Sequence, residues 1–313
     1  MFMWRKKCLC LRAIYDDDVH SLDYKHTNIE EIPPDVFLHE RTLEVLDVQS
    51  NFITHLPREL FFCAWLKKLV LADNEITELP SVVGTLIYLE ELDISKNALV
   101  NIPEEIQSCQ NLKYIDFSSN PLTKFPNGLS TLLTLTELSA NDCLLQSLPD
   151  MSKLNFLEVL ELRENKMTSL PGSFSSLHAL QKLDLGDNYF TNWPEELNSL
   201  YGLQELWLDN NKLKKIPYVS KILSSLNELD ISNNNVESMP GGVGGMKMMM
   251  TMMADDNFLT SLPDEICSCT SLTLLSLRRN NLTHLPRDIG GFLLTFFYAG
   301  ATQSLEIEGP HKK

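Results

Sequence analysis

One pattern of apolar residues returns at a fixed interval through almost the whole chain, and it constrains the fold more than any other feature. The pattern reads L-x-x-L-x-L-x-x-N-x-L-x-x-L-P and first appears complete at Leu43. Its second leucine position is held in turn by Leu46, Leu69, Leu92, Ile115, Leu138, Leu160, Leu183, Leu206, Leu229, Met252 and Leu275. The interval is 23 residues, except for 22 residues between Leu138 and Leu160. A period of this length indicates a stacked repeat protein.

Each letter of the pattern has a physical role. The L-x-L pair predicts a short strand whose alternate residues face a core, and successive strands then stack into a parallel sheet. The Leu-Pro step ends the strand side, because proline fixes φ and disfavours helix at the residue before it. One unit cannot bury its own apolar face, so neighbouring units stabilise each other. We therefore predict an α/β fold: a leucine-rich-repeat solenoid, a right-handed horseshoe with a concave parallel β-sheet, an irregular or 3-10 convex side and about 12 repeats of 23 residues.

The asparagine of the pattern turns the chain away from each strand. Its amide carries both a donor and an acceptor, so it can satisfy buried backbone groups of adjacent units and form a ladder. Ten of the eleven full units keep it, and Cys143 replaces it in the remaining unit. A thiol is only a weak donor, so we expect a softer ladder there.

The repeat divides the chain into three segments. Residues 1–19 form an N-terminal segment that is a candidate cap and lipid anchor, and residues 20–290 form the repeat array, which begins with a weaker unit around Leu22 and Ile32. Residues 291–313 diverge, because a further unit would need an apolar pair near 298 and 300, where the sequence has Tyr298 and Gly300. This tail is either an improvised C-terminal cap or the end of an alternative or truncated form of a longer chain.

Composition narrows the class of partner. With 43% hydrophobic and 22% charged residues the chain is a folded, soluble one. A net charge of −16 argues against nucleic acid and favours protein partners with basic surfaces. No apolar run reaches 18 residues, so no transmembrane helix is expected. The seven cysteines are odd in number and form no clustered capping framework like that of secreted repeat proteins, which indicates a reducing compartment.

The repeat register identifies the strand residues that point to solvent, where solenoids of this kind bind partners. The position between the two strand leucines and the two positions before the asparagine are rich in acids, and Trp207 is their one large aromatic side chain. Such a face should attract a basic partner. The candidate protein-binding residues are Asp47, Asp73, Asp93, Asp116, Asp142, Glu161, Glu164, Asp184, Asp187, Trp207, Asp209, Asp230, Asp255 and Asp256. The alternative is that these acids only keep the surface soluble.

The N-terminal segment carries two cysteines outside the repeat. Cys8 and Cys10 lie beside Arg5, Lys6 and Lys7, a context suited to S-palmitoylation and to peripheral membrane association. The alternatives are a segment that caps the first unit, and a Cys-x-Cys metal pair, which lacks nearby partners.

No catalytic constellation emerges from the remaining residues. We expect no enzyme activity, no cofactor and no metal site. Cys63, Cys109 and Cys269 share one core position and should be inert and buried. The glycines around Gly242 fall in the return after a proline and lack the lysine of a phosphate loop, so they are read as a turn.

The chain resembles the LAP family, the leucine-rich-repeat and PDZ scaffolds such as erbin, scribble and densin. The resemblance rests on Cys8-Leu9-Cys10-Leu11-Arg12, Leu22-Asp23-Tyr24, Ile32-Pro33, Val36-Phe37 and Glu161-Leu162-Arg163-Glu164-Asn165, and it covers about residues 8–290. It implies a peripheral scaffold at the basolateral cortex or cell junctions, with a role in cell polarity and with acylation of Cys8 and Cys10. This chain has fewer repeats and no PDZ domain, so functions that rest on PDZ binding do not carry over.

The function expected from these features is a non-enzymatic adaptor of the LAP type at the cytoplasmic face of the plasma membrane. Its repeat sheet would bind a protein partner. The alternative is a soluble regulator of small-GTPase signalling that resembles the Ras-suppressor repeat proteins.

Overall fold

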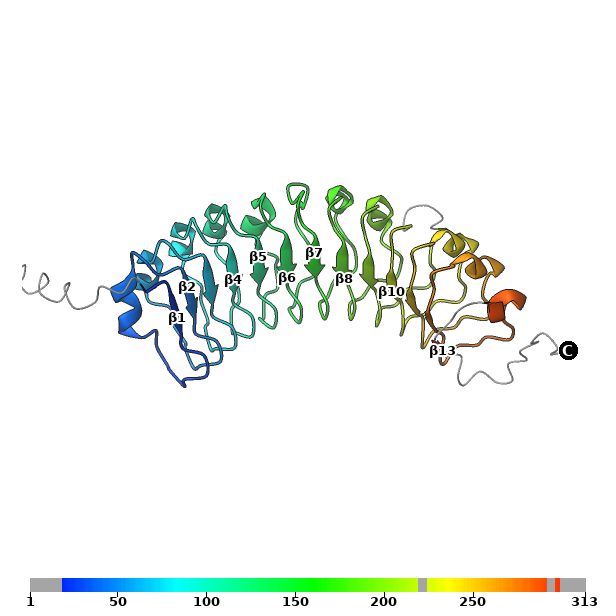
Figure 1. Ribbon diagram of the computed structural model, residues 1–313, viewed down its shortest axis with the longest axis horizontal. Coiled ribbons are helices and arrows are strands. Elements are labelled where there is room, and N and C mark those ends of the chain that lie inside the picture. The colour runs from blue at the N-terminus through cyan, green and yellow to red at the C-terminus, as the bar shows by residue number, and fades with distance from the viewer. Residues whose placement is uncertain (1–18, 219–223, 292–295, 299–313) are drawn as a thin grey trace, which may run out of the picture.

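The computed structural model describes residues 19–218, 224–291 and 296–298, and these residues form one curved array (Figure 1). Thirteen three-residue strands lie in chain order in a single sheet. They are β1 (Ser21–Asp23), β2 (Val45–Asp47), β3 (Lys68–Val70), β4 (Glu91–Asp93), β5 (Tyr114–Asp116), β6 (Glu137–Ser139), β7 (Val159–Glu161), β8 (Lys182–Asp184), β9 (Glu205–Trp207), β10 (Glu228–Asp230), β11 (Thr251–Met253), β12 (Leu274–Ser276) and β13 (Phe296–Tyr298).

All neighbouring strands are parallel, and their register follows the repeat. Leu46 of β2 lies opposite Leu69 of β3, which lies opposite Leu92 of β4. The middle residue of each strand from β1 to β12 therefore points toward the core, while the first and third residues point away from it. This arrangement confirms the predicted leucine-rich-repeat solenoid with a parallel sheet.

Short 3-10 helices make the return path and lie along the outer rim of the arc (Figure 1). They are η1 (Pro34–His39), η2 (Arg58–Phe62), η3 (Ser81–Thr85), η4 (Glu104–Ser108), η5 (Asn127–Thr131), η6 (Gly172–Ser176), η7 (Glu195–Ser199), η8 (Gly241–Gly245), η9 (Asp264–Ser268) and η10 (Arg287–Gly291). Proline precedes the first residue of each helix from η2 to η9. Its fixed φ sets the angle at which the chain leaves the sheet.

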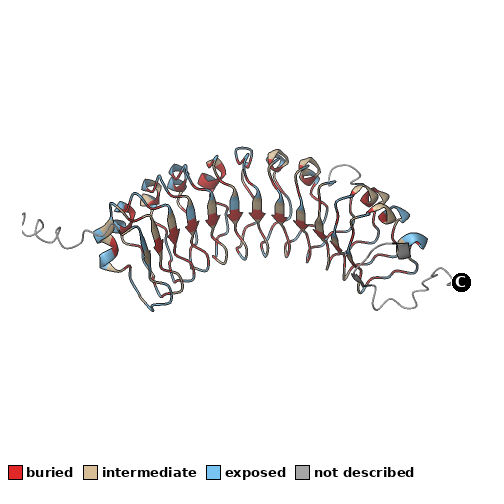
Figure 2. Cartoon of the chain, in the orientation of Figure 1, coloured by how far each residue is buried: buried red, intermediate tan, exposed pale blue. Residues whose placement is uncertain are grey.

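The core is one continuous apolar spine that runs through all units (Figure 2). Phe117 takes a strand leucine position and meets the ring of Phe125 edge to face, with 6.0 Å between centroids. The thiols of Cys63, Cys109 and Cys269 are buried in this spine as predicted, and burial raises the pKa of each, which disfavours the reactive thiolate. Met246, Met249 and Met252 are likewise buried at their repeat positions.

The asparagine ladder has the predicted double function. Asn74 donates from Nδ2 to the carbonyl of Val48 in the preceding unit at 3.0 Å, and its Oδ1 accepts from the N–H of Ile53 at 3.0 Å. Asn188, which follows β8, and Asn211, which follows β9, make the same pair of contacts. At Cys143 the thiol reaches the Phe117 carbonyl at 3.6 Å, and the amide of Leu122 donates instead to the backbone oxygen of Asn120. The ladder is thus weaker at this unit.

Two intervals between neighbouring strands are one residue shorter than the usual 23. No 3-10 helix forms between β6 and β7, where the interval from Leu138 to Leu160 is 22 residues. At the C-terminal end, β13 pairs with β12 and places Phe297 opposite Leu275, an interval that is again 22 residues. The sheet therefore continues into the segment that we set apart as residues 291–313, one residue earlier than the expected apolar position at 298.

Candidate protein-binding face

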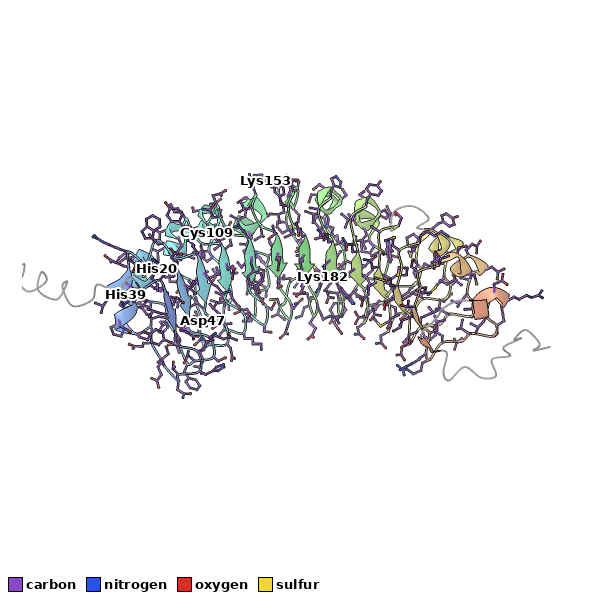
Figure 3. The ribbon with its side chains drawn as sticks, in the orientation of Figure 1. His20, His39, Asp47, Cys109, Lys153 and Lys182 are labelled. Atoms are coloured by element: carbon purple, nitrogen blue, oxygen red, sulfur yellow. The ribbon has the colours of Figure 1, made fainter. Side chains whose placement is uncertain are left out.

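The first and third residues of each strand form the open face of the sheet, the side that points away from the core. Asp93, Asp116, Asp184 and Asp230 hold the third strand position and are half-buried, because the neighbouring strands flank them. Figure 3 shows Asp47 and Lys182 on this sheet, whereas Lys153 lies at the outer rim. The register therefore places the predicted strand acids on one surface.

Sequence reasoning missed a whole column of this face. The first strand residue points to the same side as the third, since side chains alternate along a strand. This column adds Lys68, Glu91, Tyr114, Glu137, Lys182, Glu205 and Glu228. The signal was available, because the strand motif x-L-x has two outward positions and only the one between the leucines was used.

The predicted acids that precede the ladder asparagine border this face from a turn. Asp73, Asp142, Glu164, Asp187 and Asp256 all have φ between 49° and 56°. This left-handed conformation reverses the chain after the strand, and aspartate tolerates it better than most side chains. The side chains of Asp73, Asp142 and Glu164 are exposed there.

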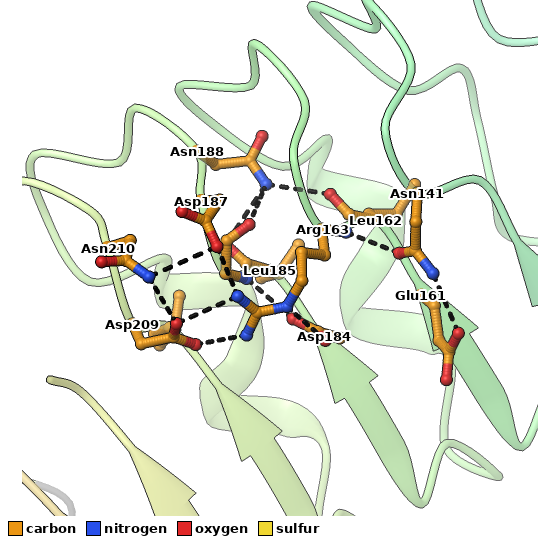
Figure 4. Close-up of polar contacts among 12 residues, drawn as sticks. Asn141, Glu161, Leu162, Arg163, Asp184, Leu185, Asp187, Asn188, Asp209 and Asn210 are labelled. Atoms are coloured by element: carbon orange, nitrogen blue, oxygen red, sulfur yellow. Dashed lines mark hydrogen bonds and ion pairs between the residues drawn. The ribbon is translucent and has the colours of Figure 1, made fainter. Parts of the chain in front are cut away.

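Arg163 binds three of the predicted acids and changes their role (Figure 4). Its Nε donates to Asp184 at 3.0 Å, its Nη2 donates to Asp209 at 2.5 Å, and its Nη1 donates to Asp187. The guanidinium thus joins β8 and two following turns into a charged clasp. Asp209 is only 7% exposed, which corrects the expectation that it offers free charge to a partner.

In the clasp, burial and the charge of Arg163 have opposite effects on the pKa of Asp184. Burial raises the pKa of the Asp184 carboxyl, and the amide of Gly186 and the charge of Arg163 oppose that rise. The hydrogen bonds to Asp209 raise the pKa of Arg163 further. Gly186 makes the contact possible, because a Cβ there would lie 2.3 Å from Nη2 of Arg163. Sequence spacing alone could not reveal a contact between Arg163 and Asp209, which are 46 residues apart in the sequence.

A second internal cation lies next to the clasp. The ammonium of Lys182 is 3.1 Å from Glu161 and 5.2 Å from the centroid of the Trp207 ring. The predicted anchor Trp207 is therefore half-buried and already has a cation over its ring.

The open face is hollowed between β3 and β6. A cavity of about 320 Å³ is lined by Lys68, Val70, Glu91, Asp93, Tyr114 and Glu137. Lys68 donates to Glu91 at 2.5 Å and so neutralises one end. Among the described residues no ion pair reaches Asp93, Asp116 or Glu137. Asp93 and Glu137 line the hollow, and Asp116 lies beside it at the end of β5.

A larger hollow lies away from the strands. It measures about 510 Å³ and runs between the Leu-Pro turns of three successive units around Phe125 and Pro126. Its only charged lining residues are Glu104 and Lys124. In the part of the chain that the structure describes, no helix is long and apolar enough to cross a bilayer. The same residues contain no group of three His, Cys, Asp or Glu side chains suited to a metal ion.

Comparison with protein families agrees with this architecture. A leucine-rich-repeat model matches residues 64–122 and 134–190, and a model of two leucine-rich-repeat copies matches residues 202–241. Human leucine-rich repeat-containing protein 7 is 41% identical over 82 residues, which are 26% of this chain and 5% of that protein. Mouse erbin is 41% identical over 69 residues, which are 22% of this chain and 5% of erbin. The matched stretch is thus a small part of each relative.

Solved structures resemble the chain over most of its length. A leucine-rich-repeat protein of Leptospira interrogans is 28% identical with a TM-score of 0.80, and the match covers 92% of this chain and 86% of that one. The ectodomain of the Arabidopsis thaliana receptor kinase GASSHO1/SCHENGEN3, solved in complex with CASPARIAN STRIP INTEGRITY FACTOR 2, is 27% identical with a TM-score of 0.66. That match covers 83% of this chain and 35% of the receptor chain. Repeat pattern, sheet, ladder and comparisons agree on the fold, and the chain forms a leucine-rich-repeat solenoid.

Proposed function

We propose that this protein is a scaffold of the LAP type that binds a basic segment of a partner protein on the open face of its sheet. The observation that carries the proposal is the set of strand carboxylates without an internal cation, above all Asp93, Asp116 and Glu137. Asp93 and Asp116 each accept a hydrogen bond from the backbone N–H two residues later. Like charges on adjacent strands still repel, and this local hydrogen bond leaves both carboxylates without a cation. A cationic partner would neutralise them.

The fold supports binding rather than chemistry. Leucine-rich-repeat domains are generally not catalytic, and the open face is a long, shallow surface made from short strands. The resemblance of Cys8-Leu9-Cys10 and of the repeats to LAP scaffolds, together with the 41% identity to leucine-rich repeat-containing protein 7 and erbin, supports the LAP assignment.

The proposed location is the cytoplasmic face of the plasma membrane, at the cell cortex or junctions. Cys8 and Cys10, the candidate acylation sites, lie outside the described residues. Two acyl chains, or one chain and a basic patch, are sufficient for stable anchoring. Fractionation of cells that express the wild type or the Cys8→Ser/Cys10→Ser variant tests this part. Wild type in the soluble fraction would rule out the anchor.

Binding is tested with variants that remove equal charge from two surfaces. The first is Asp93→Asn/Asp116→Asn/Glu137→Gln/Glu228→Gln on the open face. The control, Glu104→Gln/Glu105→Gln/Glu195→Gln/Glu196→Gln, changes η4 and η7 on the outer rim and leaves the same net charge. We expect the first variant to bind a fluorescein-labelled arginine-rich peptide at low salt about tenfold more weakly than wild type. Equal losses in both variants would show that only net charge matters, and the open face would not be the binding surface.

A further inference from the structure

The hollow between β3 and β6 has an arrangement that differs from the rest of the face. Tyr114 lies in register between Glu91 on β4 and Glu137 on β6. Asp116 follows two residues later on the same side of β5, and its register partner is Asp93. Adjacent strands are about 4.8 Å apart, so Glu91 and Glu137 flank Tyr114 on the two neighbouring strands, and Asp93 and Asp116 lie two residues further along.

The same face shows twice how it accommodates a cation. Lys182 lies between the carboxylate of Glu161 and the ring of Trp207, and Arg163 spreads its guanidinium over carboxylates from successive units. In both cases a charged side chain of the protein supplies the cation. At Tyr114 the ring and the carboxylates are present, but the lysine that lines the hollow, Lys68, is paired with Glu91.

The pKa shifts at Tyr114 and Asp116 reflect burial together with the negative charge of the neighbouring carboxylates. Burial raises the pKa of Tyr114, and the charges of Asp116, Asp93 and Glu137 raise it further. Burial also raises the pKa of Asp116, with added repulsion from Asp93 and Glu161. Burial is the larger cause of each shift, the hydrogen bonds from Ser118 oppose it at Asp116, and repulsion among the carboxylates adds to it.

We propose that the Tyr114 hollow is a subsite for one arginine side chain of the partner segment. The planar guanidinium would stack on the Tyr114 ring and donate to Glu137 on one side and to the Asp93–Asp116 pair on the other. A lysine ammonium is a compact point charge that cannot make the flat stack and the bidentate contacts together. The inference rests on the proposed function and specifies where the partner is recognised and by which residue.

The test compares two positions that are equivalent in the repeat. Glu137 and Glu205 both hold the first strand position, on β6 and β9, so Glu137→Gln and Glu205→Gln make the same change inside and outside the hollow. Tyr114→Leu removes the ring, and Tyr114→Phe keeps the ring but removes the hydroxyl. The probes are two labelled peptides of equal length and charge, one with three arginines and one with three lysines, each spaced by glycine. Urea unfolding of each full-length variant confirms that it is folded.

We expect wild type to prefer the arginine peptide. Tyr114→Leu and Glu137→Gln should each weaken arginine-peptide binding by about fivefold, while Tyr114→Phe and Glu205→Gln should bind as wild type does. Equal losses from Glu137→Gln and Glu205→Gln, or equal affinity of wild type for the two peptides, would overturn the subsite but leave the proposed function standing. Failure of wild type to bind either peptide would overturn both.

Discussion

At the scale of single residues, the ladder shows how one substitution is absorbed. Elsewhere the asparagine carbonyl accepts the N–H of the residue at the core position of the preceding unit, as Asn165 does for Leu145 at 3.0 Å. Cys143 has no such acceptor, and the Leu122 amide donates to the backbone of its own unit at 2.8 Å. The buried donor is satisfied, but the bond that would tie two units together is absent.

We predict that Cys143→Asn stabilises the array. The new amide can donate to the Phe117 carbonyl and accept from Leu122, so the free energy of unfolding should rise by about 1 kcal/mol. Urea unfolding measures the change, and hydrogen exchange at the Leu122 amide localises it. Cys143→Ala is the control and should lower stability. If the asparagine variant unfolds at a lower urea concentration than wild type, the pocket around residue 143 is too small for the amide.

The charge of Asp116 gives a second prediction at the residue scale, because its effect on the free energy of unfolding depends on pH. Burial raises the pKa of Asp116 above its ordinary value of 3.8. The folded chain therefore takes up this proton before the unfolded chain does, and the charged carboxyl costs stability at neutral pH. Asp116→Asn keeps an oxygen that can accept from Ser118 and removes the charge. We expect a higher urea midpoint at pH 7, with the difference lost as the pH falls to about 4 and below.

Asp150 serves as the matched control of opposite sign. Its Oδ1 accepts from the Ser152 amide at 2.9 Å, and this bond lowers the pKa of the exposed carboxyl. That contribution is present above the unfolded pKa and is lost as the pH falls. Asp150→Asn should therefore lower the midpoint at pH 7. The account of Asp116 fails if both asparagine variants shift the midpoint in the same direction.

At the scale of elements, the repeat period predicted the features that depend on one unit and missed those that depend on contacts between units. Strand positions, the buried thiols and the ladder follow from register, because each depends on a residue's place within one unit. The clasp around Arg163 depends on a long side chain that crosses two units, and no periodic pattern encodes its direction. The register of β13 depends on a deletion of one residue, which shifted Phe297 into the place where Tyr298 was expected.

A close contact between two 3-10 helices on the outer rim is also not predicted by the repeat pattern. Gly84 in η3 lies against η4 so closely that a Cβ would be 2.7 Å from the backbone oxygen of Glu105. Backbone cannot move aside as a flexible side chain can, so the helices would have to separate. Gly172, at the start of η6, has nothing within 4 Å of the position its Cβ would take.

We predict opposite outcomes for the same substitution at these two glycines. Gly84→Ala should lower the free energy of unfolding by about 2 kcal/mol, because it overpacks the contact between η3 and η4. Gly172→Ala should be neutral or should raise it by about 0.5 kcal/mol, because it restricts only the unfolded chain. Thermal and urea unfolding of the two variants measure the difference. Equal destabilisation would mean that alanine is disfavoured in these helices for a reason other than contact.

At the scale of the whole molecule, the net charge of −16 acts on stability and on binding through the same field. Self-repulsion opposes the folded array, and attraction favours a basic partner. Raising NaCl from about 20 mM to about 300 mM shortens the Debye length from about 20 Å to about 6 Å and weakens both effects. We therefore predict that salt raises the unfolding midpoint while it weakens binding of the arginine-rich peptide.

The clasp carboxylates are partly buried and paired with Arg163, so salt screens them less than it screens the carboxylates of the open hollow. Arg163→Gln removes that pairing and should make the stability of the variant more salt-dependent than that of wild type. A midpoint that falls with NaCl would show that the surface ion pairs, such as Lys67 with Glu44 and Lys113 with Glu90, outweigh the repulsion among the acids.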